Sequence, residues 1–326
     1  MRNSAISRPA PATGLTPLSW RRLLDPPAVE RSEGTARPVA AYDRSRFRQP
    51  EDRRSPRAVK TDATLRFFHE VLGLDYLHYG LWDPEDPLDV AGLHTAQRRY
   101  SERLVTLVPE GVQTVLDVGS GTARMSQALQ ERGFAVEGLS PDPYQADRYV
   151  ERVGAPFHLG RFQEFWPDRA YDLVLMGESS QYVWLESLFP AVLRAGAGGF
   201  LLVADYFTIA PGGAGIAVSE RSGHPLEAFL AAAERHGLAL EHREDVTARV
   251  LPTLVLARTW LDRYVAPTVA IARDSLGRRS RLLLWIARVA LGRRLERLER
   301  TSQLLDPEAF ARSKRYEILR FKVPAA

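Results

Sequence analysis

A glycine-containing turn is the stretch of this sequence best suited to bind a ligand. The apolar, β-branched run at residues 114–118 contains Asp117, and Gly119, Ser120 and Gly121 follow directly. Because glycine lacks a Cβ, its backbone adopts positive φ angles freely and its amides can approach a ligand closely. The next segment has the periodicity of a helix, whose first turn offers unpaired N–H groups to an anionic group. The spacing therefore predicts a strand, a ligand-binding glycine turn and a helix, in that order.

Two common nucleotide-binding fingerprints do not fit this turn. The dinucleotide fingerprint needs a small residue at its third glycine position, which counted from Gly119 is Arg124. A phosphate-binding P-loop needs Gly-Lys-Ser or Gly-Lys-Thr, which the sequence lacks. An NAD-dependent oxidoreductase is therefore disfavoured. The chain has no cysteine, which excludes a cysteine nucleophile, a thiolate zinc site and disulfides. No aspartate pattern points to a catalytic metal, so we expect none.

The turn resembles the first motif of the class I S-adenosylmethionine (SAM)-dependent methyltransferases, in which an acid precedes Gly-x-Gly-x-Ala. Later segments follow in the order of this family, including an apolar run at 171–176 that is typical of a parallel strand buried on both faces. The resemblance implies an α/β, Rossmann-like fold with a seven-stranded, mostly parallel sheet. It also implies SAM as the cofactor and S-adenosylhomocysteine (SAH) as the product. The predicted strands are 114–118, 135–139, 156–160, 171–176, 200–206, 238–246 and 315–323.

The resemblance implies cofactor contacts at the ends of successive strands. Ser140 stands where many class I enzymes have the acid that binds the ribose hydroxyls; the nearest acid is Asp142, and Gln145 is a second expected contact. Arg161 stands where an acid often binds the adenine amine, so either Glu164 or the backbone of the two residues between would replace it. The expected cofactor-binding residues are Tyr79, Asp117, Gly119, Ser120, Gly121, Ser140, Gln145, Phe162, Gln163 and Gly177.

An aromatic segment at residues 75–82 precedes a helix predicted at 90–107. It resembles the Tyr-Gly-aromatic stretch ahead of the SAM domain in cyclopropane fatty acid synthases and in tocopherol and sterol methyltransferases. In that lipid-directed group the segment closes over the methionine end of SAM, which makes Tyr79 our candidate for this contact. The alternative is that these aromatic side chains only pack a helical lid.

Glu178 and Tyr182, two candidate catalytic residues, follow the fourth predicted strand. Because the SAM sulfonium already makes the methyl group electrophilic, the main task is to align the acceptor with it. An oxygen or nitrogen acceptor needs a base, whereas a carbon acceptor needs its cationic intermediate stabilised, and Glu178 suits either task. Tyr182 and Tyr206 would flank the acceptor, and His224 or His78 would be the base, although a lone histidine is more often structural. The candidate catalytic residues are Glu178, Tyr182 and His224.

Composition and pattern divide the chain into five parts. Residues 1–60 are rich in arginine and proline with few apolar residues, which predicts a disordered extension. We expect a helical cap over the cofactor at 61–110 and the SAM-binding core at 111–248. A helical lid that forms the substrate pocket is expected at 249–312, and the final strand of the core at 313–326.

A basic amphipathic helix is predicted at 278–297, within the insertion. Its apolar stripe would either cover the substrate pocket or lie on an anionic membrane surface. No apolar run reaches the ~18 residues that span a bilayer, and the N-terminus lacks the apolar region of a secretory signal. We therefore expect a cytoplasmic protein, with peripheral membrane contact as the alternative. The sequence leaves the oligomeric state open.

These observations predict SAM-dependent methyl transfer to a small, lipophilic metabolite of secondary metabolism, with carbon, oxygen and nitrogen acceptors all open. One alternative is cyclopropanation of a lipid alkene. Another is a non-catalytic SAM fold that binds a membrane or a partner, which the missing ribose and adenine acids favour and the intact glycine turn opposes. Nucleic acid is not an expected partner, because no Asn/Asp-Pro-Pro-aromatic motif follows the fourth strand.

Overall fold

The computed structural model describes residues 66–71, 73–209, 223–265, 267–268, 271, 275 and 305–325. Two predicted features, the extension at 1–60 and the basic helix at 278–297, lie outside these residues. Within the described residues, no helix combines the length and the apolar character needed to cross a membrane.

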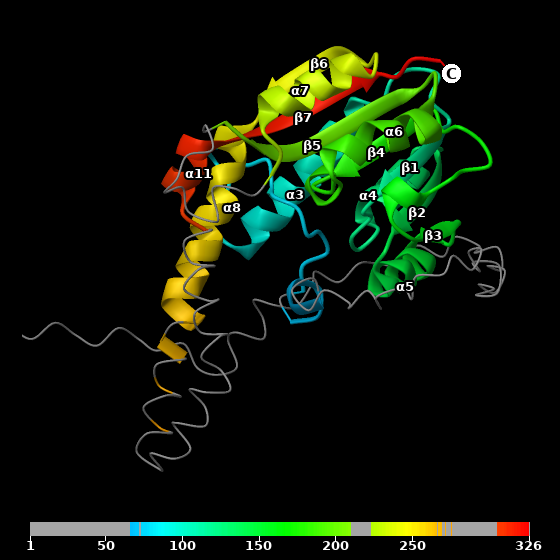
Figure 1. The fold of residues 1–326 in the computed structure, drawn as a ribbon. Helices are drawn as coiled ribbons and strands as arrows, with labels where there is room; N and C mark the ends of the chain where they lie inside the picture. Colours follow the sequence, from blue (N-terminus) through cyan, green and yellow to red (C-terminus); the bar gives the residue numbers. More distant parts are fainter. Residues whose placement is uncertain are drawn as a thin grey trace, which may run out of the picture.

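A seven-stranded sheet organises the described part of the chain (Figure 1). Its strands lie in the order β3-β2-β1-β4-β5-β7-β6. Neighbouring strands from β3 to β5 are parallel, whereas β7 runs antiparallel to both β5 and β6. The predicted seven-stranded, mostly parallel α/β sheet is therefore confirmed. The strands are β1 Thr114–Val118, β2 Ala135–Ser140, β3 Phe157–Leu159, β4 Leu173–Gly177, β5 Phe200–Thr208, β6 Ala239–Asp245 and β7 Lys314–Lys322.

Helices connect the strands and pack on the sheet (Figure 1). The helix predicted at 90–107 is α3, whose N-terminus is capped by Asp89 accepting a hydrogen bond from the Gly92 amide at 2.9 Å. The α-helices that position the site are α3 Val90–Thr106, α4 Arg124–Glu131, α5 Pro143–Arg152, α6 Leu185–Gly196, α7 Leu226–Arg235, α8 Thr247–Trp260 and α11 Pro307–Ser313.

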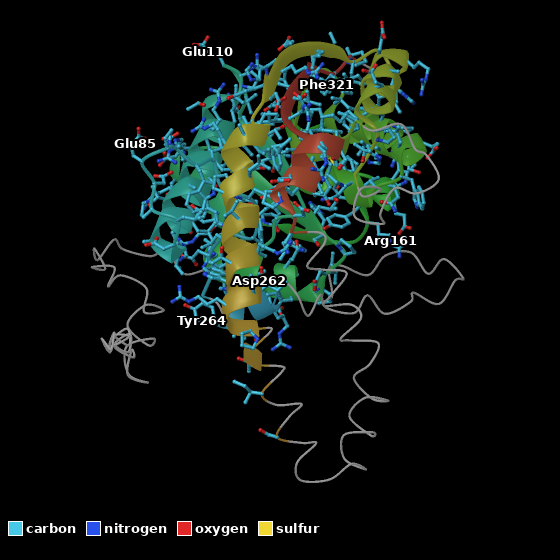
Figure 2. All side chains as sticks on the ribbon, turned by 90° about the vertical axis from the view of Figure 1, so that its left-hand side faces the viewer. Glu85, Glu110, Arg161, Asp262, Tyr264 and Phe321 are labelled. Atoms are coloured by element: carbon cyan, nitrogen blue, oxygen red, sulfur yellow. The ribbon has the colours of Figure 1, made fainter. Side chains whose placement is uncertain are left out.

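Alternate residues of the central strand β4 face two separate apolar cores. Val174 and Met176 pack with α6 and α7 on one face, and Leu173 and Leu175 pack with α3 and α8 on the other. All four side chains are buried, as the continuous apolar run predicts. Figure 2 shows Phe321, which is 1% exposed and belongs to the first of these cores. With helices on both faces, a ligand site is expected at the carboxyl ends of the strands.

Helix α8 connects the sheet to the predicted insertion. Its residues Val250 and Leu254 are buried in the same core as β7, so the helix begins as part of the core. The chain then continues as a π-helical turn, Leu261–Val265. Figure 2 shows Asp262 and Tyr264 at the protruding end of this helix, where Tyr264 is 59% exposed. The start of the predicted insertion is therefore packed on the sheet rather than detached from it.

Candidate active site

The predicted glycine turn follows β1 and lies between the ends of β2 and β4. Gly119 has a φ of +81°, and its amide donates a hydrogen bond to the Leu139 carbonyl on β2 at 2.7 Å. A Cβ on Gly119 would lie 2.6 Å from the Cβ of Ser179, which follows β4. Glycine is therefore required at this position both for its backbone conformation and for close packing.

A cavity of about 560 Å³ opens beside this turn. Its walls come from the turn, the ends of β2 and β4, the 3₁₀ turns η3 (Phe162–Glu164) and η4 (Ser180–Tyr182), and residues 76–78 ahead of α3. The carboxyl ends of parallel strands are the usual place for a ligand in an open α/β sheet. The predicted site residues that line it are Asp117, Gly119, Ser120, Gly121, Ser140, Gln145, Phe162, Gln163, Gly177, Glu178 and Tyr182.

Three polar side chains around the glycine turn are held in different ways. Asp117 is buried and accepts a hydrogen bond from the Ser126 hydroxyl on α4, and burial raises the pKa of its carboxyl to about 6. Gln145 Oε1 accepts a hydrogen bond from the Gly121 amide at 3.0 Å. The Ser120 hydroxyl is buried without a hydrogen-bond partner among the described residues. An unpaired hydroxyl at a cavity wall is available to a polar group of a ligand.

On the expected ribose side, Ser140 and Asp142 both line the cavity. The Ser140 hydroxyl accepts a hydrogen bond from the Asp142 amide at 3.2 Å. The Asp142 carboxylate caps α5 by accepting one from the Tyr144 amide at 2.9 Å. Asp142, the nearest acid in the sequence, therefore lies beside Ser140 at the position expected to bind the ribose.

The expected adenine side is formed by η3. Phe162 is 2% exposed and lines the cavity with Arg161 and Gln163, whereas Glu164 is not a wall residue. Arg161 is exposed, as Figure 2 shows, and its guanidinium lies 3.8 Å from the Glu164 carboxylate. The Gln163 carbonyl accepts a hydrogen bond from Arg194 at 2.8 Å. Of the two predicted replacements for the missing acid, Phe162 and Gln163 line the cavity and Glu164 does not.

Residues 74–82, here called the strap, run past the cavity toward α3. Near the N-terminal end of the strap, the carboxylate of Asp75 forms ion pairs with Arg124 and Arg152. Arg124 is the first residue of α4, directly after the glycine turn. The residue that breaks the dinucleotide fingerprint therefore holds the strap against the glycine turn.

The strap contributes different residues to the cavity than the sequence predicts. Residues 76–78 line it, whereas the side chain of Tyr79 lies outside and packs against the rings of Phe310 and Tyr316 at centroid distances of 6.0 and 5.6 Å. Tyr79 reaches the site through its amide, which donates to Glu178. A segment without helical or strand periodicity gives no signal of which side chains face inward.

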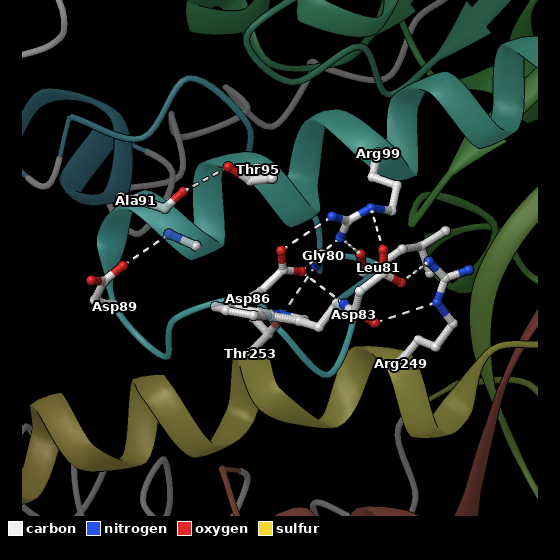
Figure 3. Close-up of polar contacts among 12 residues, drawn as sticks. Gly80, Leu81, Asp83, Asp86, Asp89, Ala91, Thr95, Arg99, Arg249 and Thr253 are labelled. Atoms are coloured by element: carbon white, nitrogen blue, oxygen red, sulfur yellow. Dashed lines mark hydrogen bonds and ion pairs between the residues drawn. The ribbon is translucent and has the colours of Figure 1, made fainter.

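A network of ion pairs and hydrogen bonds fixes the C-terminal end of the strap between α3 and α8 (Figure 3). Arg99 on α3 pairs with the carboxylates of Asp83 and Asp86 at 2.9 and 2.7 Å and donates to the Leu81 carbonyl at 2.6 Å. Arg249 on α8 pairs with Asp83 at 2.8 Å. Both helices therefore bind the acidic loop that follows the strap, and these ion pairs fix its C-terminal end.

We expect Arg99→Met to lower the free energy of unfolding by about 2 kcal/mol, because two carboxylates and a carbonyl lose their shared donor. Urea unfolding measures this loss, and native-state hydrogen exchange should show faster exchange of the strap amides. The exposed neighbour on the same helix provides the control: Arg98→Met should change stability by less than about 0.5 kcal/mol. Equal losses in the two variants would show that the network does not stabilise the fold.

Glu178 follows β4 and is fixed by several elements at once. Its φ is +57°, in the left-handed region that non-glycine residues rarely adopt, and its amide donates to the Ala204 carbonyl on β5 at 2.8 Å. Its Oε1 accepts hydrogen bonds from the Tyr79 amide at 2.8 Å and from the Tyr316 hydroxyl at 2.7 Å. The hydroxyl of Tyr316 lies 3.0 Å from that of Tyr100 on α3. The strap, β7 and α3 therefore hold one carboxyl group at the cavity.

Burial raises the pKa of the Glu178 carboxyl from 4.5 to about 8, against the opposing effect of its hydrogen bonds. The folded state therefore keeps a proton that the unfolded state has lost, and stability falls as the pH rises from about 5 to 8. Glu178→Gln should reduce this fall by about 1–2 kcal/mol, a value that allows for partial exposure. Urea unfolding at several pH values in this window measures it. Parallel pH profiles for the two proteins would contradict the prediction.

Asp205 on β5 organises the turn η4 beside the cavity. It is fully buried and accepts hydrogen bonds from the Ser180 hydroxyl at 2.7 Å, the Tyr206 amide at 2.9 Å and the Gln181 amide at 3.2 Å. His224 Nε2 lies 3.0 Å from the Ser180 carbonyl, and His224 is not a wall residue of the cavity. The structure thus places this candidate base behind the turn and not inside the cavity.

His78, the other candidate base, lines the cavity but is already engaged. Its ring stacks on Tyr100 at 4.1 Å. Its Nδ1 donates to the Tyr79 carbonyl at 2.7 Å, so Nε2 is the acceptor toward the Ser101 hydroxyl at 3.3 Å. Burial lowers the pKa of His78 to about 4, which keeps the ring neutral at neutral pH. These contacts favour the structural alternative for this histidine.

The tyrosine pair beside Glu178 was not predicted from the sequence. Tyr100 and Tyr316 lie 216 residues apart in the chain, on α3 and β7, and no local pattern relates them. Among the residues that the structure describes, no group of three or more His, Asp or Glu side chains could hold a metal ion.

Comparison with known proteins identifies the fold. No protein-family model matches the chain. A curated relative, an uncharacterized methyltransferase of Exiguobacterium sibiricum, is 30% identical over 78 residues, which cover 24% of this chain and only 37% of that relative. Among solved structures, a candidate sarcosine dimethylglycine methyltransferase from Galdieria sulphuraria has a TM-score of 0.61 at 18% identity, covering 81% of this chain and 99% of the other.

Two further structures extend the comparison. The [4+2]-cyclase SpnF has a TM-score of 0.59 at 18% identity, covering 80% of this chain and 93% of the cyclase. Geranyl diphosphate C-methyltransferase from Streptomyces coelicolor, solved with Mg²⁺, geranyl diphosphate and SAH, has a TM-score of 0.55 at 20% identity, covering 78% and 92%. The chain has the class I methyltransferase fold. Because that fold also carries a cyclase, activity must be argued from the site.

Proposed function

We propose that this protein is a SAM-dependent methyltransferase that acts on a small, lipophilic molecule. One observation carries the proposal: the glycine turn and Glu178 line the same cavity at the carboxyl ends of the parallel strands. The methyltransferase relative and the SAH-bound structural neighbour support SAM as the cofactor.

The residues of the cavity fit this cofactor. Its volume of about 560 Å³ lies in the range of small-molecule sites. The glycine turn has no Cβ at Gly119 or Gly121, and the unpartnered Ser120 hydroxyl is available to a polar group. Asp117 and the ends of β2 and η3 complete the set that would hold SAM. When bound, SAM supplies a methyl group made electrophilic by the sulfonium.

Aromatic side chains at the rim of the cavity support a lipophilic acceptor. Tyr182 and Trp184 line the cavity yet are 79% and 78% exposed, which offers aromatic surface to an apolar molecule. Glu178 is the group best placed for proton chemistry. It would accept a proton from an oxygen or nitrogen acceptor, or stabilise the cation formed at a carbon acceptor.

Calorimetric titration of the full chain with SAM and with SAH tests the proposal. We expect micromolar binding of both, and loss of both in Asp117→Ala, because the acid anchors the glycine turn through Ser126. Transfer of a labelled methyl group to apolar acceptors would then identify the substrate. A folded wild-type protein that binds neither nucleoside would overturn the proposal.

A further inference from the structure

The acidic side chains at the cavity differ in how far the protein already uses them. Asp117 is 3% exposed, and Asp142 is 6% exposed and caps a helix. Glu178 is half-buried, and both of its donors, from Tyr79 and Tyr316, reach Oε1. No donor reaches its Oε2 within the part of the chain that the structure describes. Glu178 therefore presents an open carboxylate oxygen from a less buried position than either aspartate.

The fold keeps Glu178 in this position at a cost in free energy. Its left-handed φ of +57° is unfavourable for a residue with a Cβ, and its carboxyl group is partly removed from water. Tyr316 donates to the carboxylate and its hydroxyl also contacts that of Tyr100, and both tyrosines are 0% exposed. Strain of this kind at a cavity wall is typical of a functional position.

We propose that Glu178, held by the pair Tyr316 and Tyr100, is the counter-charge through which the protein distinguishes cationic SAM from neutral SAH. This inference rests on the proposed function. The two nucleosides share their adenosine, amino and carboxylate groups and differ only in the methyl group and the positive charge on sulfur. A carboxylate in the same cavity attracts the sulfonium and not the thioether. The preference would favour binding of the methyl donor and release of the product.

The protonation of Glu178 gives this preference a measurable signature. Without a cation in the cavity, its pKa of about 8 leaves the carboxyl protonated at neutral pH. A bound sulfonium favours the ionised form, so SAM binding should release a proton and should strengthen as the pH rises toward 8. SAH binding should do neither.

Several other titratable groups lie around Glu178. Burial raises the pKa of Tyr79, Tyr100 and Tyr316, so they stay protonated. His78, with a pKa of about 4, titrates below the pH range of the test, and Asp205 and Asp117, each with a pKa of about 6, titrate at its lower end, below Glu178. The groups are His78 and Tyr79 on the strap, Tyr100 on α3, Asp117 on β1, Tyr182 on η4, Asp205 and Tyr206 on β5, and Tyr316 on β7.

Calorimetry with SAM and SAH between about pH 6 and pH 8, in buffers of different ionisation enthalpy, tests the inference. In the wild type we expect the ratio of SAM affinity to SAH affinity to rise by up to about tenfold per pH unit. We also expect SAM binding at neutral pH to release a proton. Glu178→Gln should weaken SAM binding at the upper pH by about tenfold, leave SAH binding within about twofold and abolish the proton release. This variant also gives the baseline for ionisation of the ligands themselves.

Three further variants make the outcome decisive. Tyr316→Phe removes a donor from the carboxylate and should move the rise in SAM affinity to higher pH. Tyr171→Phe, a buried tyrosine that donates to the Glu137 carboxylate and is not a wall residue, should behave as the wild type. Asp117→Asn should weaken both nucleosides alike.

The inference is overturned if Glu178→Gln keeps the wild-type preference for SAM and the wild-type proton release. It is also overturned if the preference and the proton release are lost in Asp117→Asn alone. Should Glu178→Gln fail to fold, Tyr316→Phe decides instead, and an unshifted pH profile in that variant would overturn the inference. A wild type that binds neither nucleoside would overturn the proposed function, and this inference with it. A wild type that binds both, without a pH-dependent preference, would overturn this inference alone.

Discussion

Gly119→Ala should reduce SAM affinity by more than about 100-fold, or roughly 2.7 kcal/mol. The new Cβ would lie 2.6 Å from the Cβ of Ser179, and the φ of +81° is unfavourable for alanine. Ser179 is held by its hydroxyl, which donates to the Val118 carbonyl at 2.5 Å, and it directly follows Glu178. Relief of the clash must therefore separate the ends of β1 and β4 and displace the cavity wall. Calorimetric titration with SAM measures the loss.

Gly111→Ala is the matched control for this substitution. Gly111 has nearly the same φ, +83°, but its added Cβ would meet no atom within 4 Å, and the residue lies before β1, away from the cavity. Both variants carry the same backbone strain, about 1 kcal/mol, whereas the clash with Ser179 is added in Gly119→Ala alone, and only Gly119→Ala should lose SAM binding. Equal SAM affinities in the two variants would contradict the assignment of the glycine turn as the cofactor loop.

Asp205→Ala should lower the free energy of unfolding by about 3–4 kcal/mol. The carboxylate is 0% exposed and accepts hydrogen bonds from Ser180, Gln181 and Tyr206. Without it, the Ser180 hydroxyl would be left buried and the amides of Gln181 and Tyr206 would be left partly buried. The turn η4 would lose its anchor on β5, so Tyr182 at the cavity rim should also lose its fixed position. Urea unfolding at neutral pH measures the stability of the variant.

An exposed aspartate serves as the control for this change. Asp168, in the loop before β4, is exposed, and Asp168→Ala should change stability by less than about 0.5 kcal/mol. Asp205→Asn retains one acceptor oxygen and should fall between the two. A loss in Asp205→Ala no larger than that in Asp168→Ala would mean that η4 is held by its other contacts.

The sequence by itself determined the order of the strands along the chain and the place of the glycine turn. Both are local properties: the buried run of β4 and the positive φ of Gly119 depend on a few neighbouring residues. Because parallel strands end at the same edge of a sheet, local strand ends also predicted that Ser140 and Glu178 would share one cavity with the turn.

Only the tertiary structure decided which side chains complete the site. The strap has no regular period, so its sequence could not show that His78 faces the cavity while the side chain of Tyr79 lies outside it. The partners of Glu178 come from α3 and β7, and they meet because β7 is inserted between β5 and β6. His224 was one of two candidate bases, yet packing put it behind η4. The positions of these side chains depend on contacts between residues far apart in the chain, which a local sequence pattern cannot predict.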